Sequence, residues 1–456
     1  MIKKEAKTAL IGYIICWILF MGILIFLLAR NGANMEEISG FLADRFFTWS
    51  FLLFAHLFFV ICYSLFLLVR YLYRTYKKRG LKGMLKRGFF RIVLPALLIF
   101  LSFRLLIFYN TAEDYNYIWD TSVENTSGVS RNFYATDGKH RGMSVFGWNK
   151  ENSKAVDSLI KNNVEWVAVT PFLYQENEQS ALMRVPKEIG TWSRRDSTFI
   201  IAIKELHAKG IHVQLKPHLW MGDGWRSNVN HPTPEAWSRW FASYQENMLH
   251  YASMAQHTGA ELFCVGTELK SALRAQPEAW KTLVNKIKQR YTGKLTYASN
   301  WDGEFKEVPF WDQMDYIGIQ AYFPLTKTKN PELAAIKEGW DRHIVLLEEL
   351  YKEHQRPILF TEVGYKSEAA ATIRPWEWDS ALSALKQKKS DLTQQRAYEA
   401  LYQTLWHKPW FAGAYIWQWD TRTTEDSLWL QMDFSPRYKP AQNTIAKWYG
   451  PLGKLL

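Results

Sequence analysis

The sequence is poor in cysteine, with three among its 456 residues: Cys16, Cys62 and Cys264. The first two fall in long apolar runs near the N-terminus, and Cys264 lies alone in a short apolar run much further along. This spacing excludes a disulfide framework in the C-terminal part, which must be held together by its hydrophobic core. No cluster of histidine and acidic residues has the spacing of metal ligands, so we expect neither a metal nor another cofactor.

Acidic residues are scarce in the first 110 positions. That stretch holds 15 Lys and Arg against four acids (Glu5, Glu36, Glu37 and Asp44), a net charge of +11. The other 346 residues hold 41 basic and 40 acidic side chains, so the overall charge of +12 belongs to the N-terminal segment. A nucleic-acid-binding protein needs basic clusters on its folded domain. The near-neutral C-terminal part argues against a nucleic-acid partner.

Long stretches of the N-terminal segment also lack charge. Residues 9–29 are uncharged, and residues 49–69 are interrupted only by His56. Each run is long enough to cross a bilayer as a helix. A third run, residues 92–109, contains Arg104 near its far end, from where a long side chain can reach the interface. The pattern predicts an all-α transmembrane module of three helices, with the lipid bilayer as its partner, and it is too long for a cleaved signal peptide.

The segments between these runs indicate an orientation. Residues 70–91 carry nine Lys or Arg and no acid, so they are expected on the cytoplasmic side together with the N-terminus. Three crossings then leave everything after residue 110 outside the cytosol. The sequence therefore predicts an integral protein of the bacterial inner membrane, with a linker over residues 111–139 and a periplasmic or extracytoplasmic domain over residues 140–456. The sequence does not identify a protein partner.

From residue 140 onward, short apolar runs alternate with longer amphipathic stretches. Near-continuous apolar runs favour parallel strands covered by helices on both faces. Eight strand–helix units in about 300 residues predict an α/β fold, the (β/α)8 TIM barrel. The alternative is an open doubly wound sheet, which would place a glycine-rich phosphate turn after the first strand, and "SVFGWNKENS" has none. The predicted strands are residues 142–147, 164–170, 211–217, 261–266, 294–299, 315–320, 357–361 and 413–417.

The C-terminal ends of the strands of such a barrel carry its functional residues. Two carboxylates occur there, Glu268 after "ELFCVGT" and Glu362 in "RPILFTEVGY". An unpaired carboxylate at the edge of a core is costly, so each needs a partner or a chemical role. Other strand ends carry large aromatics and hydrogen-bonding groups, a combination that suits the apolar face and hydroxyl edges of a sugar. These candidate substrate-binding residues are His218, Trp220, Trp225, Asn300, Trp301, Tyr322, Trp417 and Trp419.

Two glutamates in this position fit glycoside hydrolysis. A retaining glycosidase needs two carboxyl groups about 5–5.5 Å apart, one as acid/base and one as nucleophile. Structural alternatives exist for both residues. Glu268 could be a first-turn helix residue capped by Thr267, and Glu362 could be half of a buried ion pair with Lys216 or Arg356. Two carboxylates on suitable strands beneath an aromatic rim favour the catalytic interpretation.

The segments "VGTELKS" and "FTEVGY" resemble the motifs of the clan of retaining β-glycosidases. They are most similar to glycoside hydrolase family 113, whose known members are β-1,4-mannanases, and the resemblance covers about residues 138 to 450. It implies that Glu268 is the acid/base and Glu362 the nucleophile. It also implies that Tyr322 hydrogen-bonds the nucleophile and that Trp417 is the aromatic platform of the −1 subsite.

One departure from the clan concerns the residue before the acid/base. Most members have Asn there, which contacts the sugar 2-hydroxyl, whereas this chain has Thr267. The resemblance implies a membrane-anchored retaining hydrolase, endo-acting on β-1,4-mannan-like or related polysaccharide. The same carboxylates would serve a transglycosylase or trimming enzyme of envelope polysaccharide. A non-catalytic glycan-binding barrel is a further alternative, against which the intact glutamate pair argues.

Overall fold

The computed structural model describes residues 2–30, 34–46, 48–112, 117–149, 151–183, 194–378, 383–421 and 432–451. The chain forms two compact units, Met1–Leu105 and Leu106–Leu456. The regular secondary structure described in the first unit is all helical, and the second unit contains all the described strands.

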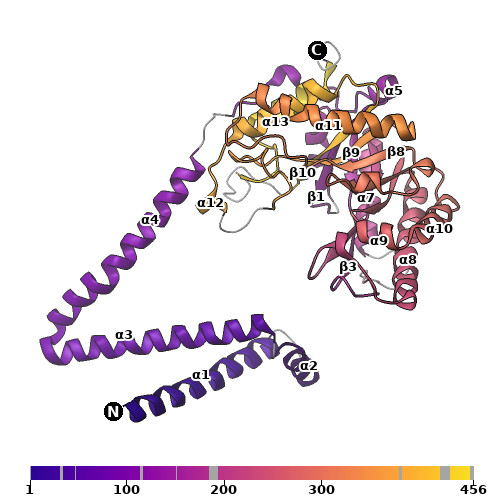
Figure 1. The fold of residues 1–456 in the computed structure, drawn as a ribbon. Helices are drawn as coiled ribbons and strands as arrows, with labels where there is room; N and C mark the ends of the chain where they lie inside the picture. The colour runs from indigo at the N-terminus through magenta and orange to yellow at the C-terminus, as the bar shows by residue number, and fades with distance from the viewer. Residues whose placement is uncertain are drawn as a thin grey trace. The chain divides into compact units, whose positions relative to one another are not determined.

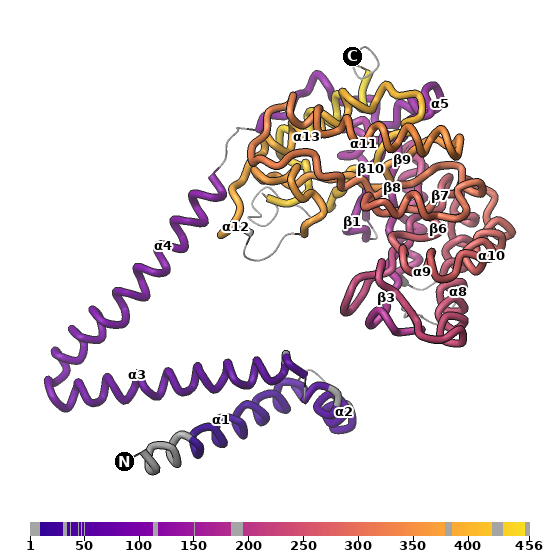
Figure 2. Tube along the Cα trace, viewed as in Figure 1, coloured from indigo at the N-terminus to yellow at the C-terminus, as the bar shows by residue number. Residues whose placement is uncertain are grey.

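Two long helices of the first unit lie side by side (Figures 1 and 2). Aromatic side chains join them: the Tyr13 hydroxyl lies 3.1 Å from His56 Nε2, and the Tyr13 ring packs edge-on against Phe59. His56 is therefore a packing residue between two helices. The helical elements of this part of the chain are α1 (Ile2–Arg30), α2 (Met35–Arg45), α3 (Trp49–Gly88), the π-helical segment η1 (Phe89–Val93) and α4 (Leu94–Thr111).

Two helical segments are apolar and long enough to cross a membrane. They are Leu10–Arg30, whose most apolar 18-residue window has a mean hydropathy of 2.7, and Phe51–Thr111, whose corresponding window has a mean hydropathy of 2.5. Few or none of the side chains in these windows are buried, which distinguishes them from the core helices of a soluble domain. The second segment contains both later runs of the sequence analysis, because the chain continues as helix through the basic stretch, with one kink at Gly80 (φ 65°). The structure thus provides two candidate spans where the sequence predicted three separate helices.

The second unit is a closed barrel of parallel strands in the order β1-β2-β4-β6-β7-β8-β9-β10. This confirms the predicted TIM barrel, and each predicted run coincides with a strand. Figure 1 shows the helices arranged around the strands. The strands are β1 (His140–Phe146), β2 (Trp166–Val169), β4 (His212–Leu215), β6 (Leu262–Thr267), β7 (Lys294–Asn300), β8 (Tyr316–Gln320), β9 (Ile358–Val363) and β10 (Phe411–Asp420). The helices are α5 (Tyr134–Asp137), α6 (Ser153–Lys161), α7 (Arg194–Ala208), α8 (Pro234–Thr258), α9 (Lys270–Ala275), α10 (Pro277–Lys288), α11 (Leu333–His354), α12 (Ser383–Lys386), α13 (Asp391–Leu405) and α14 (Pro440–Tyr449).

The strands are apolar on both faces because each face is covered. On β2, Trp166 and Ala168 join a cluster of residues from five barrel strands, which places them inside the barrel. Val167 and Val169 belong instead to the larger core that the surrounding helices share. Full burial of such a side chain contributes about 1.5–3 kcal/mol, so the alternation stabilises an inner and an outer layer together.

Three strands carry one extra residue relative to a neighbour near the C-terminal end of the barrel. An extra residue reverses the inward–outward alternation and re-aims the side chains that follow. On β9, Leu359 lies inside the barrel and Phe360 outside, so regular alternation would turn Glu362 outward. The extra residue turns it inward. The shifts fall between Cys264 and Thr267 of β6, between Phe360 and Glu362 of β9, and between Ile416 and Trp419 of β10.

A small parallel sheet extends the barrel at this end. Its strands β3 (Phe172–Gln175) and β5 (His218–Met221) continue β2 and β4 after short breaks. This extension fixes the positions of His218 and Trp220 next to the barrel mouth.

Candidate active site

Glu362 is buried at the C-terminal end of β9 among polar neighbours. Lys216 Nζ donates to its Oε1 at 2.6 Å, and the Tyr322 hydroxyl donates to its Oε2 at 2.9 Å. His218 Nε2 lies 3.4 Å from Oε1, and burial together with the charges of Lys216 and Arg226 holds the pKa of His218 well below its usual value, so the ring is neutral. Burial raises the pKa of the Glu362 carboxyl, and the charge and hydrogen bond of Lys216 oppose that rise.

Of the structural alternatives for the two glutamates, one is observed in the structure and two are not. Lys216 does form a buried ion pair with Glu362, whereas Arg356 donates to a backbone carbonyl elsewhere. Thr267 does not cap a helix that begins at Glu268, because α9 starts at Lys270 and its N-cap is Leu269. The ion pair does not compete with a chemical role for Glu362, because a buried carboxylate needs such a partner to remain charged.

Glu268 follows β6 in a strained backbone conformation. Its φ is 51°, a region that costs a non-glycine residue roughly 1–2 kcal/mol. Two hydrogen bonds maintain this backbone conformation. The Glu268 N–H donates to Ala298 O at 2.9 Å, and the Glu268 carbonyl accepts from Ser227 Oγ at 2.8 Å. The carboxylate accepts from Gln320 Nε2 at 2.9 Å and lies 2.8 Å from Arg226 Nη2.

The Gln320 amide connects the two carboxylates through hydrogen bonds. Its Nε2 donates to Glu268, and its Oε1 accepts from Lys216 at 2.9 Å, while Lys216 also donates to Glu362. All four side chains are buried. A continuous chain of this kind holds both carboxylates in fixed positions relative to each other.

Both glutamates line one cavity of about 450 Å³ at the C-terminal end of the barrel. Aromatic rings form much of its wall beside the polar groups, which is the composition of a sugar-binding site. Trp301 stacks on Trp376 with ring centroids 4.6 Å apart, and Trp417 packs edge-on against Trp378 at 6.0 Å. The predicted substrate-binding residues along this cavity are Trp225, Asn300, Trp301, Tyr322 and Trp417.

The other three predicted substrate-binding residues do not line this cavity. His218 is buried beside Glu362 and stacks parallel to Trp417 at 6.3 Å. Trp220 is 47% exposed and packs edge-on against a neighbouring ring outside the cavity lining. Trp419 is 1% exposed and lies in the core beneath the Arg437 guanidinium. The extra residue on β10 explains this position, because it turns Trp419 to the outer face while Trp417 faces the cavity.

Several lining residues were missed by the sequence reasoning. Gln320 has a readable signal, since it is a polar residue at an inward position of the apolar strand "DYIGIQ". Trp376 and Trp378 come from the segment after β9, where no periodicity marks them. The remaining lining residues missed are Arg226, Glu377 and Phe434.

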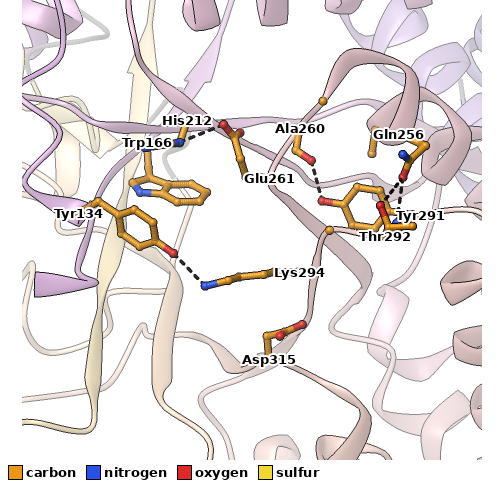
Figure 3. Close-up of a pocket in the computed structure, with 13 residues that line it drawn as sticks. Tyr134, Trp166, His212, Gln256, Ala260, Glu261, Tyr291, Thr292, Lys294 and Asp315 are labelled. Carbon is orange, nitrogen blue, oxygen red and sulfur yellow. Dashed lines mark hydrogen bonds and ion pairs between the residues drawn. The ribbon is translucent and has the colours of Figure 1, made fainter. Parts of the chain in front are cut away.

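A second cavity, of about 570 Å³, lies at the opposite end of the barrel (Figure 3). Its polar groups bond to one another: His212 Nδ1 lies 3.0 Å from Glu261 Oε1, and Lys294 Nζ donates to the Tyr134 hydroxyl at 3.0 Å. Residues at this end of a TIM barrel serve stability. Within the described ranges, no three His, Cys, Asp or Glu side chains gather as a metal site would require.

Comparisons with known proteins match the barrel to a glycoside hydrolase family. The profile of Glycoside Hydrolase Family 113 matches residues 141–435. The GH113 beta-mannanase AaManA from Alicyclobacillus acidocaldarius, solved in complex with ManMIm, is 26% identical, with a TM-score of 0.59 over 68% of this chain and 97% of its own. A GH113 beta-1,4-mannanase solved as a complex is 23% identical, with a TM-score of 0.59 over 68% of this chain and 98% of its own, a likeness of fold.

No curated protein matches the sequence. The family profile nevertheless spans well over half of the chain, and the matched residues contain the whole cavity wall described above, including Glu268 and Glu362. The protein is therefore a glycoside hydrolase and belongs to family 113.

Proposed function

We propose that this glycoside hydrolase is a retaining enzyme that cleaves β-1,4-mannan-like or related polysaccharide within the chain by double displacement. The observation that carries the proposal is the pair of buried carboxylates, Glu268 and Glu362, which line a single aromatic-walled cavity and are joined through Gln320 and Lys216. A mannan-like substrate is supported by the similarity to a GH113 beta-mannanase.

In the first step, an ionised Glu362 oxygen attacks the anomeric carbon while Glu268 gives its proton to the departing glycosidic oxygen. The bond to the leaving sugar breaks, and its electron pair stays on the protonated oxygen. Tyr322 keeps its proton throughout, because burial and the neighbouring Glu362 charge raise the pKa of its hydroxyl well above the usual range. It therefore remains a donor that holds Glu362 in position.

In the second step, water replaces the leaving sugar. Glu268, now ionised, takes a proton from the water as its oxygen attacks the anomeric carbon, and the bond to Glu362 breaks with its electrons returning to the carboxylate. Lys216 stabilises that returning charge at 2.6 Å. Trp417 supplies an apolar face beneath the reacting sugar. Two inversions at the same carbon give net retention.

The test uses the full chain in detergent with β-1,4-mannan, β-1,4-glucan and β-1,4-xylan oligosaccharides. Mass spectrometry identifies the cleaved chain, and proton NMR in the first minutes identifies the anomer released before it equilibrates. We expect internal cleavage of mannan and the β anomer first. Early α anomer would establish inversion, and absence of cleavage of every chain would favour a binding protein.

We further propose that residues 1–110 anchor the enzyme in a bacterial inner membrane with its barrel outside the cytosol. The exposed apolar helices support the anchor, and the nine-cation segment of residues 70–91 supports the orientation. A reporter that works only outside the cytosol should be active when fused after residue 115 and silent when fused near residue 80. The reverse pattern would reject both the orientation and the location.

A further inference from the structure

Arg226 is the single cationic side chain among the described residues that line the cavity of the two glutamates. It is 9% exposed, and its guanidinium lies over the Trp225 ring, 4.4 Å from the centroid. Its Nη2 is 2.8 Å from Glu268 Oε2, but this contact is a charge pair without the alignment of a hydrogen bond. Its Nε–H has no hydrogen-bond partner among the described residues. Arg226 therefore has donor capacity that the protein itself does not use.

The proposed chemistry leaves this arginine without its counter-ion. Glu268 must carry a proton before it can act as a general acid, and it then no longer balances the charge of Arg226. A buried charge without a partner is costly. The other acids along the cavity are already paired with cations. These pairs are Asp302 with Lys270 at 3.1 Å, Glu377 with Arg374 at 2.8 Å and Glu362 with Lys216 at 2.6 Å.

We propose that the substrate supplies the missing anion: the polysaccharide carries uronic acid units, and Arg226 binds the carboxylate of the sugar on the leaving-group side of the cleaved bond. This rests on the proposed function, because the position follows from Glu268 as the acid that protonates the leaving oxygen. A guanidinium presents two parallel N–H groups that match the two oxygens of a carboxylate. Trp225 holds the guanidinium plane, and pairing with the substrate releases Glu268 to accept its proton.

Binding tests the inference without turnover. The full chain with Glu362→Ala is titrated with β-1,4-mannan and β-1,4-glucan oligosaccharides, each before and after oxidation of the C6 hydroxyl to a carboxylate. We expect at least one oxidised chain to bind about 10–100-fold more tightly than its neutral parent, less so at high salt. Adding Arg226→Gln should remove the preference, and Arg226→Lys should keep part of it. Equal affinity for oxidised and neutral chains, or a preference that survives Arg226→Gln, would overturn the inference.

The matched control is Arg274→Gln, which removes an exposed arginine that pairs with Glu307 away from the cavity lining. It should leave the preference unchanged, and thermal unfolding should show that all variants remain folded. Turnover by the wild-type enzyme separates the two proposals. Cleavage of neutral chains as fast as oxidised ones would defeat uronate recognition while leaving the glycosidase assignment intact. Arg226-dependent binding of an oxidised chain without cleavage would defeat the hydrolytic proposal and support anion recognition.

Discussion

Strand β6 has a glutamate at each end, and the two side chains are in opposite situations. Glu261 precedes the strand at the barrel bottom. Burial alone would raise its pKa, but hydrogen bonds from His207, His212 and the Val213 N–H outweigh that effect and lower the pKa to about 2. Glu268 follows the strand at the mouth, in a strained backbone conformation, with a guanidinium beside it that is not aligned for a hydrogen bond.

The comparison separates a structural carboxylate, Glu261, from the carboxylate that we propose is reactive, Glu268, by how completely hydrogen-bond donors surround each one. At the bottom, hydrogen bonds from His212 and the Val213 N–H fix the charge of Glu261 and join the start of β4 to the start of β6; Figure 3 shows the His212 contact. At the mouth, backbone strain and strand irregularities aim Glu268 and Glu362 into a cavity instead. Strain that the surrounding structure maintains is commonly found at functional sites. Substitutions at the mouth should therefore reduce turnover, whereas substitutions at the bottom should reduce stability.

Glu362→Ala should produce the largest loss, about 10⁴-fold or more in kcat, because it removes the covalent route. Azide or formate placed in the vacated space should restore part of the activity and give a product of inverted configuration, which NMR would identify. The unfolding temperature should not fall in proportion to activity. Full activity in this variant would show that the mouth carboxylate is structural, and the contrast with the barrel bottom would disappear.

Glu268→Ala should cost about 10²–10⁴-fold on substrates with poor leaving groups, the usual worth of a positioned proton donor. Activated aryl glycosides need no proton on departure, so they should still form the glycosyl-enzyme at Glu362. That intermediate should accumulate and be detectable by mass spectrometry, because water then lacks its general base. Azide should release it with retained configuration. Equal losses on both substrate types would remove Glu268 from the acid/base role.

The barrel could be predicted from the sequence because its strands are covered on both faces. Continuous apolar runs such as "VEWVAVT" are readable when neither face needs polar residues, and each such run became a strand. The functional candidates at the strand ends could be predicted for a related reason. Glu268 and Glu362 interrupt apolar runs at the carboxyl end, where barrels of this class place functional residues. Both line the cavity.

The direction in which side chains near those strand ends point could not be predicted from the sequence. Trp417 and Trp419 are two positions apart and would share a face on a regular strand, yet one extra residue on β10 separates them into cavity and core. Arg226 offered no pattern either, because it lies in a 3-10 turn after β5 and reaches Glu268 only through the tertiary fold. Local periodicity carries no information about such irregularities.

Lys216→Met should have an intermediate effect that depends on pH. The Lys216 charge opposes the burial that raises the pKa of Glu362, so its removal should raise that pKa further. The nucleophile must be ionised, and the acidic limb of kcat/KM should therefore move to higher pH, with a loss of about 10–100-fold near pH 5–6 and partial recovery above pH 8. Lys408→Met, which removes a cation paired with Glu348 outside the cavity lining, should leave the profile unchanged. A loss equal at every pH would indicate a purely structural lysine.

Glu261→Gln should have the smallest effect on catalysis and a clear effect on stability. The pKa of Glu261 is lowered from 4.5 to about 2 in the folded protein, so the carboxylate contributes stability above about pH 4.5, and this contribution is lost as the pH falls towards 2. Because the side chain is 35% exposed, solvent screening reduces the expected destabilisation at pH 7 to about 1–3 kcal/mol. Chemical denaturation at pH 7 and pH 3 should show the gap between variant and wild type narrowing at the lower pH. Glu278→Gln, at an exposed helix position, provides the control and should change neither stability nor pH dependence appreciably. A Glu261→Gln enzyme that keeps its stability but loses turnover would mean that the bottom of the barrel takes part in the chemistry.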